Sequence, residues 1–480
     1  MISIFIFVLC FVTFINALAI VNRQHSLLIQ SLQKVKNGPK KQWFDQYIDH
    51  FNHQDNRMWK QRFYVNDTFY NDQLGGPVFF QIGGEGAISP GYVTSLQMSR
   101  YAQSMGALQV TLEHRFYGES HPFPDMRVSN LRYLSSQQAL TDAARFITHI
   151  KKLYPNAGSV ITFGGSYPGA LASWFRGKFP TITQGAIASS APVHAVVDMV
   201  TYLDVVGRSL DMLGGVACDN AVKQATTKLD SMLKSSSGLR EVSSRFQTCT
   251  PLHDPLDIQN FLSTVIGNFM GVVQYNREIK SAPTVKDLCK IMENTTQSPF
   301  DNLVDLSNQF TSKTPSNCID VDYNKMIAGL KNITNWGETG VGIRQWTYQT
   351  CAEFGFFQTT DGGAAQPFGS GIPLSFYTGI CREVFGFDNE PPVEFSNLYY
   401  GSSKPLGSSR IVFVNGNVDP WSSLSVLHNL SPTLLAVEVD GGAHCSNMRP
   451  WSPGMNINIK HAQTKIAQEI QTFLSLGPGK

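Results

Sequence analysis

The chain has 480 residues, of which 42% are hydrophobic and 15% are charged. This composition is typical of a globular protein with a large core and excludes an intrinsically disordered chain. The formal net charge is only +2, and no long basic block is present, so we do not expect nucleic acid as a partner.

Residues 1–19 form an uncharged apolar run that ends in Ala17-Leu18-Ala19. This ending is typical of signal peptidase cleavage after Ala19, although the usual Lys or Arg near the start is missing. Polar Thr13 and Asn16 interrupt the run, which is already short for a membrane span. We therefore predict a signal peptide over residues 1–19, a secreted or lysosomal protein, and no membrane anchor.

Short apolar runs alternate with helical patterns in the segment that follows. The runs at 77–82, 108–114, 159–165 and 185–192 predict buried strands. Residues 135–154 place Leu140, Ala143 and Phe146 on one helical face, with a serine available as the cap. Such alternation predicts an α/β fold, in which a parallel sheet has helices on both faces.

The alternation stops between residues 193 and 408, where helical patterns prevail. Strand patterns return at 410–416 and 434–442, and a last helix is predicted over 460–476. We therefore predict an α/β domain in two parts, over residues 20–192 and 409–480, interrupted by a mainly helical insertion over residues 193–408.

The cysteines and glycosylation sequons fit an oxidising compartment. Six cysteines fall between residues 218 and 381, whereas Cys445 stands apart. The six allow 15 pairings, among which the sequence does not choose, but their clustering indicates a segment stapled to itself. Cys445 is expected to be a partly buried free cysteine. Four Asn-x-Ser/Thr sequons predict surface glycans at Asn66, Asn294, Asn332 and Asn429.

Ser166 lies in the phrase "ITFGGSYPGALASWF", between a strand pattern and a helix pattern. Glycines beside a serine let the backbone bend sharply, and such an elbow lifts the hydroxyl above the carboxyl end of the strand. Pro168 stands where the G-x-S-x-G pattern has its last glycine, which puts the geometry of the first helical turn in doubt. On this motif alone, a serine-capped glycine turn explains Ser166 equally well.

A nucleophilic serine needs a base, and the base needs an orienting carboxylate. Asp419 follows the predicted strand at 410–416, and His444 follows the strand at 434–442. The chain order Ser166, Asp419, His444 is that of an α/β-hydrolase triad. Alone, Asp419 could cap a turn and His444 could lie on a surface loop, but the shared order and placement favour a triad.

The oxyanion hole is expected to use the N–H of Tyr167, which follows the serine, and that of Gly84 in the loop "GGEG". Burial of Glu85 in that loop would require a cation. The α-amino group of a substrate is one candidate, but an internal salt bridge with Arg115 is the interpretation we favour. No sequence motif predicts a metal or a cofactor.

Several longer phrases resemble the S28 family of serine peptidases, in particular its thymus-specific branch. They run from about residue 43 to 450 and include "FDQYIDHFN", "GGPVFFQIGGEG", "LEHRFYGES", "YLSSQQALTD", "GGSYPGALASWFRGKFP", "SSAPV", "QWTYQTCAEFG", "VNGNVDPW" and "AHC". The resemblance implies an α/β-hydrolase with a helical cap, in which Ser166 is the nucleophile, Asp419 the orienting acid and His444 the base.

The resemblance also implies the disulfide pairs and the kind of substrate. The implied pairs are Cys218–Cys289, Cys249–Cys318 and Cys351–Cys381, with Cys445 left free. The implied activity is hydrolysis near the end of short, proline-containing peptides. Glu85 would favour recognition of a terminal amine and Arg449 of a terminal carboxylate, so dipeptidyl-peptidase and carboxypeptidase modes both stay open.

Two other functions are compatible with the same sequence. The chain could be an esterase or lipase on the same fold, or a catalytically silent binding protein, although an intact Ser, Asp and His argue against the latter. The oligomeric state, including a homodimer, is left open.

Overall fold

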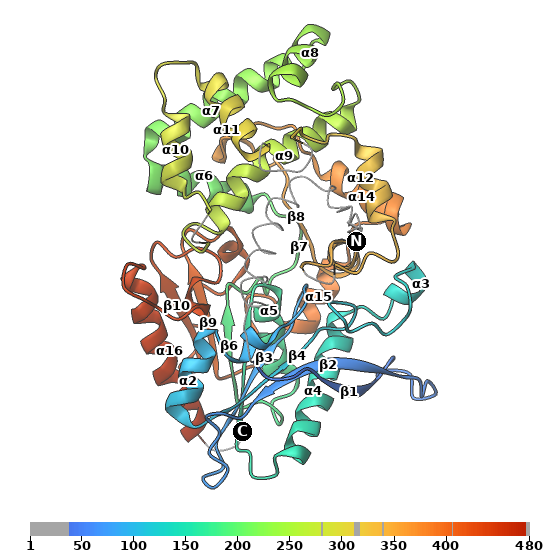
Figure 1. Ribbon diagram of the computed structural model, residues 1–480, viewed down its shortest axis with the longest axis vertical. Coiled ribbons are helices and arrows are strands. Elements are labelled where there is room, and N and C mark those ends of the chain that lie inside the picture. The colour runs from blue at the N-terminus through green and yellow to red at the C-terminus, as the bar shows by residue number, and fades with distance from the viewer. Residues whose placement is uncertain (1–37, 280–281, 312–316, 338–339, 406, 477–480) are drawn as a thin grey trace, which may run out of the picture.

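The computed structural model describes residues 38–279, 282–311, 317–337, 340–405 and 407–476 (Figure 1). The predicted signal peptide lies outside these residues. A mixed sheet of eight strands has the order β1-β2-β4-β3-β5-β6-β9-β10. Strand β2 is antiparallel to β1 and β4, and the other neighbours are parallel. The strands are β1 (Gln42–Tyr47), β2 (Met58–Asn66), β3 (Val78–Ile82), β4 (Leu108–Leu112), β5 (Val160–Gly165), β6 (Gly185–Ser189), β9 (Ile411–Gly416) and β10 (Leu434–Val439).

Helices cover both faces of this sheet, as the alternating pattern predicts. Helices α2 (Gln97–Met105) and α16 (Ile457–Ser475) pack on one face, where Phe79 joins their cluster. Helices α4 (Ser136–Leu153) and α5 (Tyr167–Lys178) pack on the other face with Phe80. Phe79 and Phe80 are neighbours in β3 but pack against helices on opposite faces of the sheet, because successive side chains of a strand point to opposite faces.

Helix α4 begins and ends where its sequence predicts. The Ser135 side chain accepts a hydrogen bond from Gln138 N, which satisfies one of the free N–H groups of the first turn. Leu140, Phe146 and Ile147 recur at helical spacing and are all buried. This apolar stripe holds the helix against the sheet.

Between β6 and β9 the chain forms a helical cap at one end of the sheet (Figure 1). Helix α9 is its core, since it is buried over most of its length and begins at Pro255 with Asp254 as the cap. Two short parallel strands, β7 (Val196–Asp198) and β8 (Gly355–Phe357), lie between the cap and the sheet. The cap helices are α6 (Thr201–Gly214), α7 (Val216–Met232), α8 (Ser236–Arg245), α9 (Pro255–Gln274), α10 (Val285–Met292), α11 (Pro299–Thr311), α12 (Tyr323–Leu330), α13 (Ile343–Gln349), α14 (Leu374–Phe385) and α15 (Val393–Tyr400).

Shorter helical segments complete the described chain. They are α3 (Val128–Leu131), the 3₁₀ turns η1 (Pro90–Val93), η3 (Gly363–Ala365), η4 (Pro420–Leu424) and η5 (Ser446–Met448), and the π-helical turn η2 (Thr350–Phe354). The fold is an α/β-hydrolase with an inserted cap.

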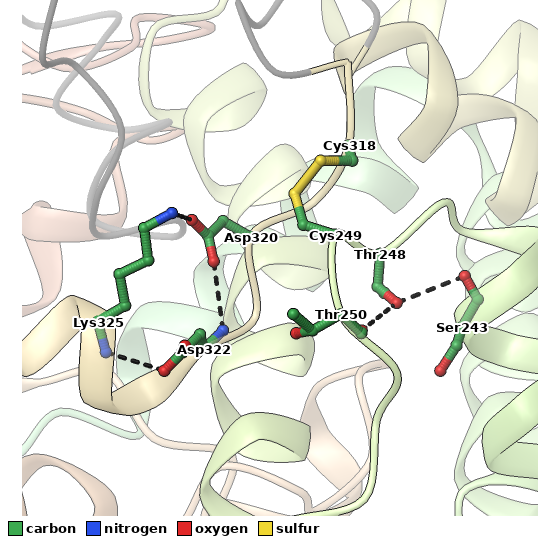
Figure 2. Close-up of a disulfide and its surroundings, with 8 residues drawn as sticks. All are labelled: Ser243, Thr248, Cys249, Thr250, Cys318, Asp320, Asp322 and Lys325. Carbon is green, nitrogen blue, oxygen red and sulfur yellow. Dashed lines mark hydrogen bonds and ion pairs between the residues drawn. A yellow bond between two sulfur atoms is a disulfide. The ribbon is translucent and has the colours of Figure 1, made fainter.

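Three disulfides staple the cap to itself, and they are the pairs that the family resemblance implies. They join Cys218 to Cys289, Cys249 to Cys318 and Cys351 to Cys381. Figure 2 shows the second of these, beside which the Thr248 hydroxyl donates to Thr250 O at 2.7 Å and Lys325 pairs with Asp320 at 2.7 Å. Of the described cysteines, Cys445 is the one outside a disulfide, and it is partly buried.

Asn66 was expected to lie on the surface as a glycan site, and this expectation is wrong because the residue is buried. Asn66 ends β2, is 7% exposed, and its amide nitrogen donates to Val93 O at 2.8 Å. That nitrogen is the atom that would carry the sugar. Asn294, Asn332 and Asn429 are exposed, as expected of their sequons. No helix within the described ranges is long and apolar enough to cross a membrane.

Candidate active site

Ser166 lies at the turn between β5 and α5, in a conformation that few residues adopt. Its φ is 65° and its ψ is −135°, and its N–H donates to Ser189 O at 2.9 Å. A positive φ is strained for a residue with a side chain, and such strain gathers at functional sites. A Cβ on Gly164 would lie 2.0 Å from Pro168 O, so this turn requires glycine there.

Pro168 fits the first turn of α5 without disturbing it. Gly169 N and Ala170 N both donate to Ser166 O, at 2.8 and 3.1 Å. Proline lacks only an N–H that the first turn leaves unpaired in any case. A Cβ on Gly84 would lie 2.2 Å from Pro168 Cγ, so the loop after β3 packs closely on this turn. The departure from G-x-S-x-G therefore leaves the helix start regular.

The predicted acid and base meet beyond the ends of β9 and β10. His444 Nδ1 and Asp419 Oδ1 are 2.9 Å apart, and the two side chains are 3% and 0% exposed. Asp419 caps η4, and its Oδ1 also accepts from Trp421 N at 3.0 Å. His444 N donates to Gln274 O of α9 at 2.9 Å, so the cap holds the backbone of this histidine.

The environment of His444 favours its charged form. Burial alone would disfavour the charge, but the negative charge of Asp419, the Cys445 sulfur and the hydrogen bonds to both outweigh burial and raise the pKa of His444 well above its usual range. An imidazole held in this way by a buried carboxylate is suited to accept a proton from a neighbouring group.

The end of β6 ties the serine turn to the histidine loop. Ser189 O accepts from Ser166 N, while Ser189 Oγ accepts from the amide of Asn447 at 2.9 Å. Ser190 Oγ accepts from Cys445 N at 2.8 Å. A Cβ on Gly165 would lie 2.8 Å from Cys445 Sγ. The loops that carry Ser166 and His444 are therefore packed together.

A cavity of about 980 Å³, including its open mouth, begins at Ser166 and extends under the cap. Most of its walls are aromatic or apolar, which is typical of a pocket for a small ligand. Its lining residues are Glu85, Ser166, Gln274, Tyr275, Met326, Leu330, Trp346, Thr347, Thr350, Cys351, Phe356, Phe357, Gln358, Tyr377, Ile380 and Trp421.

Glu85 faces this cavity, and the expected salt bridge with Arg115 is wrong. Arg115 instead pairs with Asp142, with Nη2 2.6 Å from Oδ1, and also binds backbone carbonyls. Glu85 is 7% exposed, and burial raises its pKa to about 7. Its carbonyl accepts from Gly342 N at 3.0 Å, which joins the loop after β3 to the cap.

Arg449 lies beside the histidine loop but is not among the residues that line the cavity. Its Nη2 donates to Glu278 Oε2 at 2.7 Å and to Arg277 O at 3.3 Å. Glu278 is buried and lies four residues after Gln274. The predicted carboxylate receptor is therefore already engaged in an ion pair with the cap.

Two cap residues that the sequence did not single out, Gln274 and Tyr275, reach the loops of Asp419 and His444. Gln274 accepts from His444 N, and its side chain accepts from Tyr202 OH at 2.5 Å and from Trp421 Nε1 at 3.1 Å. The Tyr275 ring meets the His444 ring edge-on at 6.0 Å. No motif marks this end of α9.

In the parts of the chain that the structure describes, no cluster of three His, Cys, Asp or Glu side chains is placed to hold a metal ion.

Comparison with known proteins relates most of the chain to one peptidase family. Residues 46–466 match the serine carboxypeptidase S28 family. The thymus-specific serine protease of Mus musculus is 35% identical over 91% of this chain and 88% of its own. The lysosomal Pro-X carboxypeptidase of Bos taurus is 30% identical over 85% of this chain and 82% of its own. A solved proline iminopeptidase from Mycobacterium smegmatis is 11% identical, covers 90% of this chain and 99% of its own, and has a TM-score of 0.42.

Proposed function

The chain belongs to the serine carboxypeptidase S28 family and is a serine-type peptidase. From this premise we propose that it is an exopeptidase with a Ser166–Asp419–His444 triad. The observation that carries the proposal is the buried bond between His444 and Asp419, on loops that pack against the strained turn of Ser166.

In the proposed mechanism, Ser166 Oγ attacks the scissile carbonyl carbon while His444 takes the hydroxyl proton. The imidazolium then gives that proton to the leaving amine, and a water molecule hydrolyses the acyl-enzyme by the same steps. Asp419 stabilises the imidazolium each time His444 takes up a proton. The N–H groups of Tyr167 and Gly84 are the proposed oxyanion donors, since Tyr167 begins α5 and Gly84 packs on Pro168 of the same turn.

The proposed substrates are short peptides with proline near the scissile bond. The cap covers the cavity and would exclude a folded protein, and the rings of Trp346, Phe356 and Trp421 offer flat apolar walls to a pyrrolidine ring. The name of the lysosomal Pro-X carboxypeptidase supports proline for that relative, and we extend the preference to this chain.

For the end of the peptide, recognition of a free amino group is the mode that the geometry favours. Glu85 is buried and shares the cavity with Ser166. A carboxylate in such a place binds an ammonium group strongly, because the surroundings screen the charges little. A peptide held by its amine at Glu85 would present a bond close to its amino end to Ser166.

The carboxypeptidase mode is the second candidate, and one observation favours it. Arg449 Nε is buried and has no hydrogen-bond partner among the described residues, although Nη2 is engaged with Glu278. Because Nη2 already donates to Glu278 and to Arg277 O, the Nε–H is left to donate one hydrogen bond to a carboxylate. In that mode the terminal carboxylate of the peptide would lie beside the histidine loop.

Proline-containing peptides with free, amino-blocked or carboxyl-blocked ends separate the two modes when products are identified by mass spectrometry. We expect hydrolysis to stop on amino blocking, and Glu85→Gln to raise KM by about tenfold or more, the size of a charged hydrogen bond. Arg449→Gln serves as the matched control. Loss of hydrolysis on carboxyl blocking, together with a raised KM in Arg449→Gln alone, would establish the carboxypeptidase mode instead.

The same assay tests the two other functions. Turnover of esters without turnover of any peptide would mean an esterase or lipase, and no turnover together with no labelling by a serine-directed phosphonate would mean a silent binding protein. A secreted or lysosomal location is proposed, in keeping with the three disulfides and the lysosomal relative.

A further inference from the structure

A chain of buried polar side chains runs from the cap to the residue that follows Ser166. We call Tyr117, Gln349, Tyr167 and His114 the elbow network. Gln349 Oε1 accepts from Tyr117 OH at 2.6 Å, and Gln349 Nε2 donates to Tyr167 OH at 2.9 Å. Tyr167 OH lies 3.0 Å from His114 Nε2. These four residues are at most 4% exposed, so each bond is sheltered from water.

The chemistry of the groups fixes the direction of every bond in this network. His114 Nδ1 is 2.8 Å from Arg115 O, which only accepts, so Nδ1 carries the proton. Burial lowers the pKa of His114 to about 4, which keeps the ring neutral and Nε2 an acceptor. Tyr167 OH therefore donates to His114 and accepts from Gln349. The Tyr167 hydroxyl is thus held on both sides.

Gln349 is itself held by the turn that follows it. Helix α13 ends at Gln349 and continues into η2, a π-helical turn of the kind often found at functional sites. Gln349 Nε2 also donates to Glu353 Oε2 at 3.3 Å, and Glu353 Oε1 accepts from Ser136 Oγ at 2.7 Å. The Cys351–Cys381 disulfide fastens the same turn to α14.

The hydrogen bonds of the elbow network join three segments that lie far apart in the sequence. Gln349 and Glu353 come from "QWTYQTCAEFG", His114 and Tyr117 from "LEHRFYGES", and Tyr167 from "GGSYPGALASWFRGKFP". The triad uses none of these side chains. The Tyr167 ring also packs against Trp346 and Phe354, each with ring centroids 5.5 Å away.

We propose that Gln349 is a positioning residue for the oxyanion hole. By holding the Tyr167 hydroxyl from the cap side, it fixes the first turn of α5 and with it the direction of the Tyr167 N–H. Gln349 is not among the residues that line the cavity, so it would act through Tyr167. The inference rests on the proposed acyl-enzyme mechanism, in which that N–H binds the developing oxyanion. A donor aimed at charge that develops in the transition state raises kcat more than it lowers KM.

Gln349→Met, which keeps the volume and removes the amide, tests the proposal in the full chain. We expect kcat to fall by about 10- to 100-fold and KM to stay within about twofold, since misaiming one oxyanion donor costs less than removing it. Tyr167→Phe deletes the other partner of the same bond and should lower kcat alike. The double variant should be no slower than the slower single variant, because both changes remove one interaction.

Gln366→Met is the matched control, because Gln366 is another buried cap glutamine whose amide binds Gly369 O at 2.7 Å, away from the elbow network. It should lower thermal stability and leave kcat unchanged. The inference is overturned if Gln349→Met and Tyr167→Phe keep kcat within about twofold of the wild type, if KM carries the loss, or if the losses add. Absence of peptide turnover in the wild type would instead refute the proposed function itself.

Discussion

Replacing Asp419 by asparagine removes the negative charge beside His444 and keeps the size of the side chain. The carboxylate is fully buried, and its Oδ1 is 2.9 Å from His444 Nδ1. The amide oxygen of the asparagine could still accept from Trp421 N, as Asp419 does at 3.0 Å. An amide oxygen in that place also accepts from His444 Nδ1, as Asp419 Oδ1 does at 2.9 Å, so the substitution tests the charge more than the packing.

The expected loss follows from the charge interaction. At an effective dielectric constant of about 20, a carboxylate and an imidazolium with charge centres about 4 Å apart attract by roughly 4 kcal/mol. If this attraction is realised only when His444 is charged in the transition state, its loss lowers kcat about 10³-fold. If the amide instead turns its NH₂ group toward His444, the imidazole also takes the wrong tautomer, and in a comparable triad the total loss is about 10⁴-fold.

The pH profile gives an independent check. Asp419 raises the pKa of His444, and the base acts only when it is neutral, so activity in the wild type rises with pH through that pKa. Without the charge the pKa of His444 falls, and the acidic limb of kcat/KM should move to lower pH while the maximum drops.

The assay measures initial rates on a proline-containing peptide from pH 4 to 10, so that it includes a pKa of His444 well above its usual range. Asp440→Asn is the matched control, because Asp440 is an exposed acid in the loop after β10 whose carboxylate binds only the Asn417 amide at 2.7 Å in the described structure. We expect this control to keep wild-type kcat. An Asp419→Asn enzyme with more than a tenth of wild-type kcat, or with an unmoved acidic limb, would refute the reasoning.

Three further outcomes are expected. Cys218→Ser with Cys289→Ser opens a disulfide whose cysteines are 71 residues apart, which should destabilise the cap by about 4 kcal/mol in chemical denaturation; an unchanged midpoint would contradict this. The pKa of Glu85 is raised from 4.5 to about 7 in the fold, so between these pH values the folded state keeps a proton that the unfolded state releases. As the pH rises from 4.5 to 7, the free energy of unfolding of the wild type should therefore fall by about 3 kcal/mol relative to that of Glu85→Gln. Parallel stability curves of the two proteins would refute this. Peptide mapping of the glycosylated protein should find sugar on Asn294 and not on Asn66, and an occupied Asn66 would contradict its burial.

The sheet strands near the site were predictable because each is a short apolar run with turn residues at its ends. Strands β1 and β2 were not predicted. β1 (Gln42–Tyr47) is an edge strand with mostly exposed or half-buried residues, so it carries little hydrophobic signal. Its pairing with β2 is antiparallel and local, unlike the parallel strands that the alternating pattern indicates.

The places of Ser166, Asp419 and His444 could be predicted because each follows a strong strand signal. The partners of buried charges could not. Arg115 binds Asp142 across 27 residues of chain, and nothing in the sequence prefers that carboxylate to Glu85. Similarly, Gln274 contacts His444 and Gln349 contacts Tyr167 from the cap, and these contacts depend on how the insertion packs on the sheet. Periodicity describes one element at a time and contains no such information.

Labelling with a serine-directed phosphonate tests whether Ser166 is the nucleophile of a serine exopeptidase. We predict that the label maps to Ser166 by mass spectrometry, and that Ser166→Ala is neither labelled nor active on peptides while its unfolding temperature stays that of the wild type. Label on another residue, or full peptide turnover by Ser166→Ala, would mean that Ser166 is not the nucleophile.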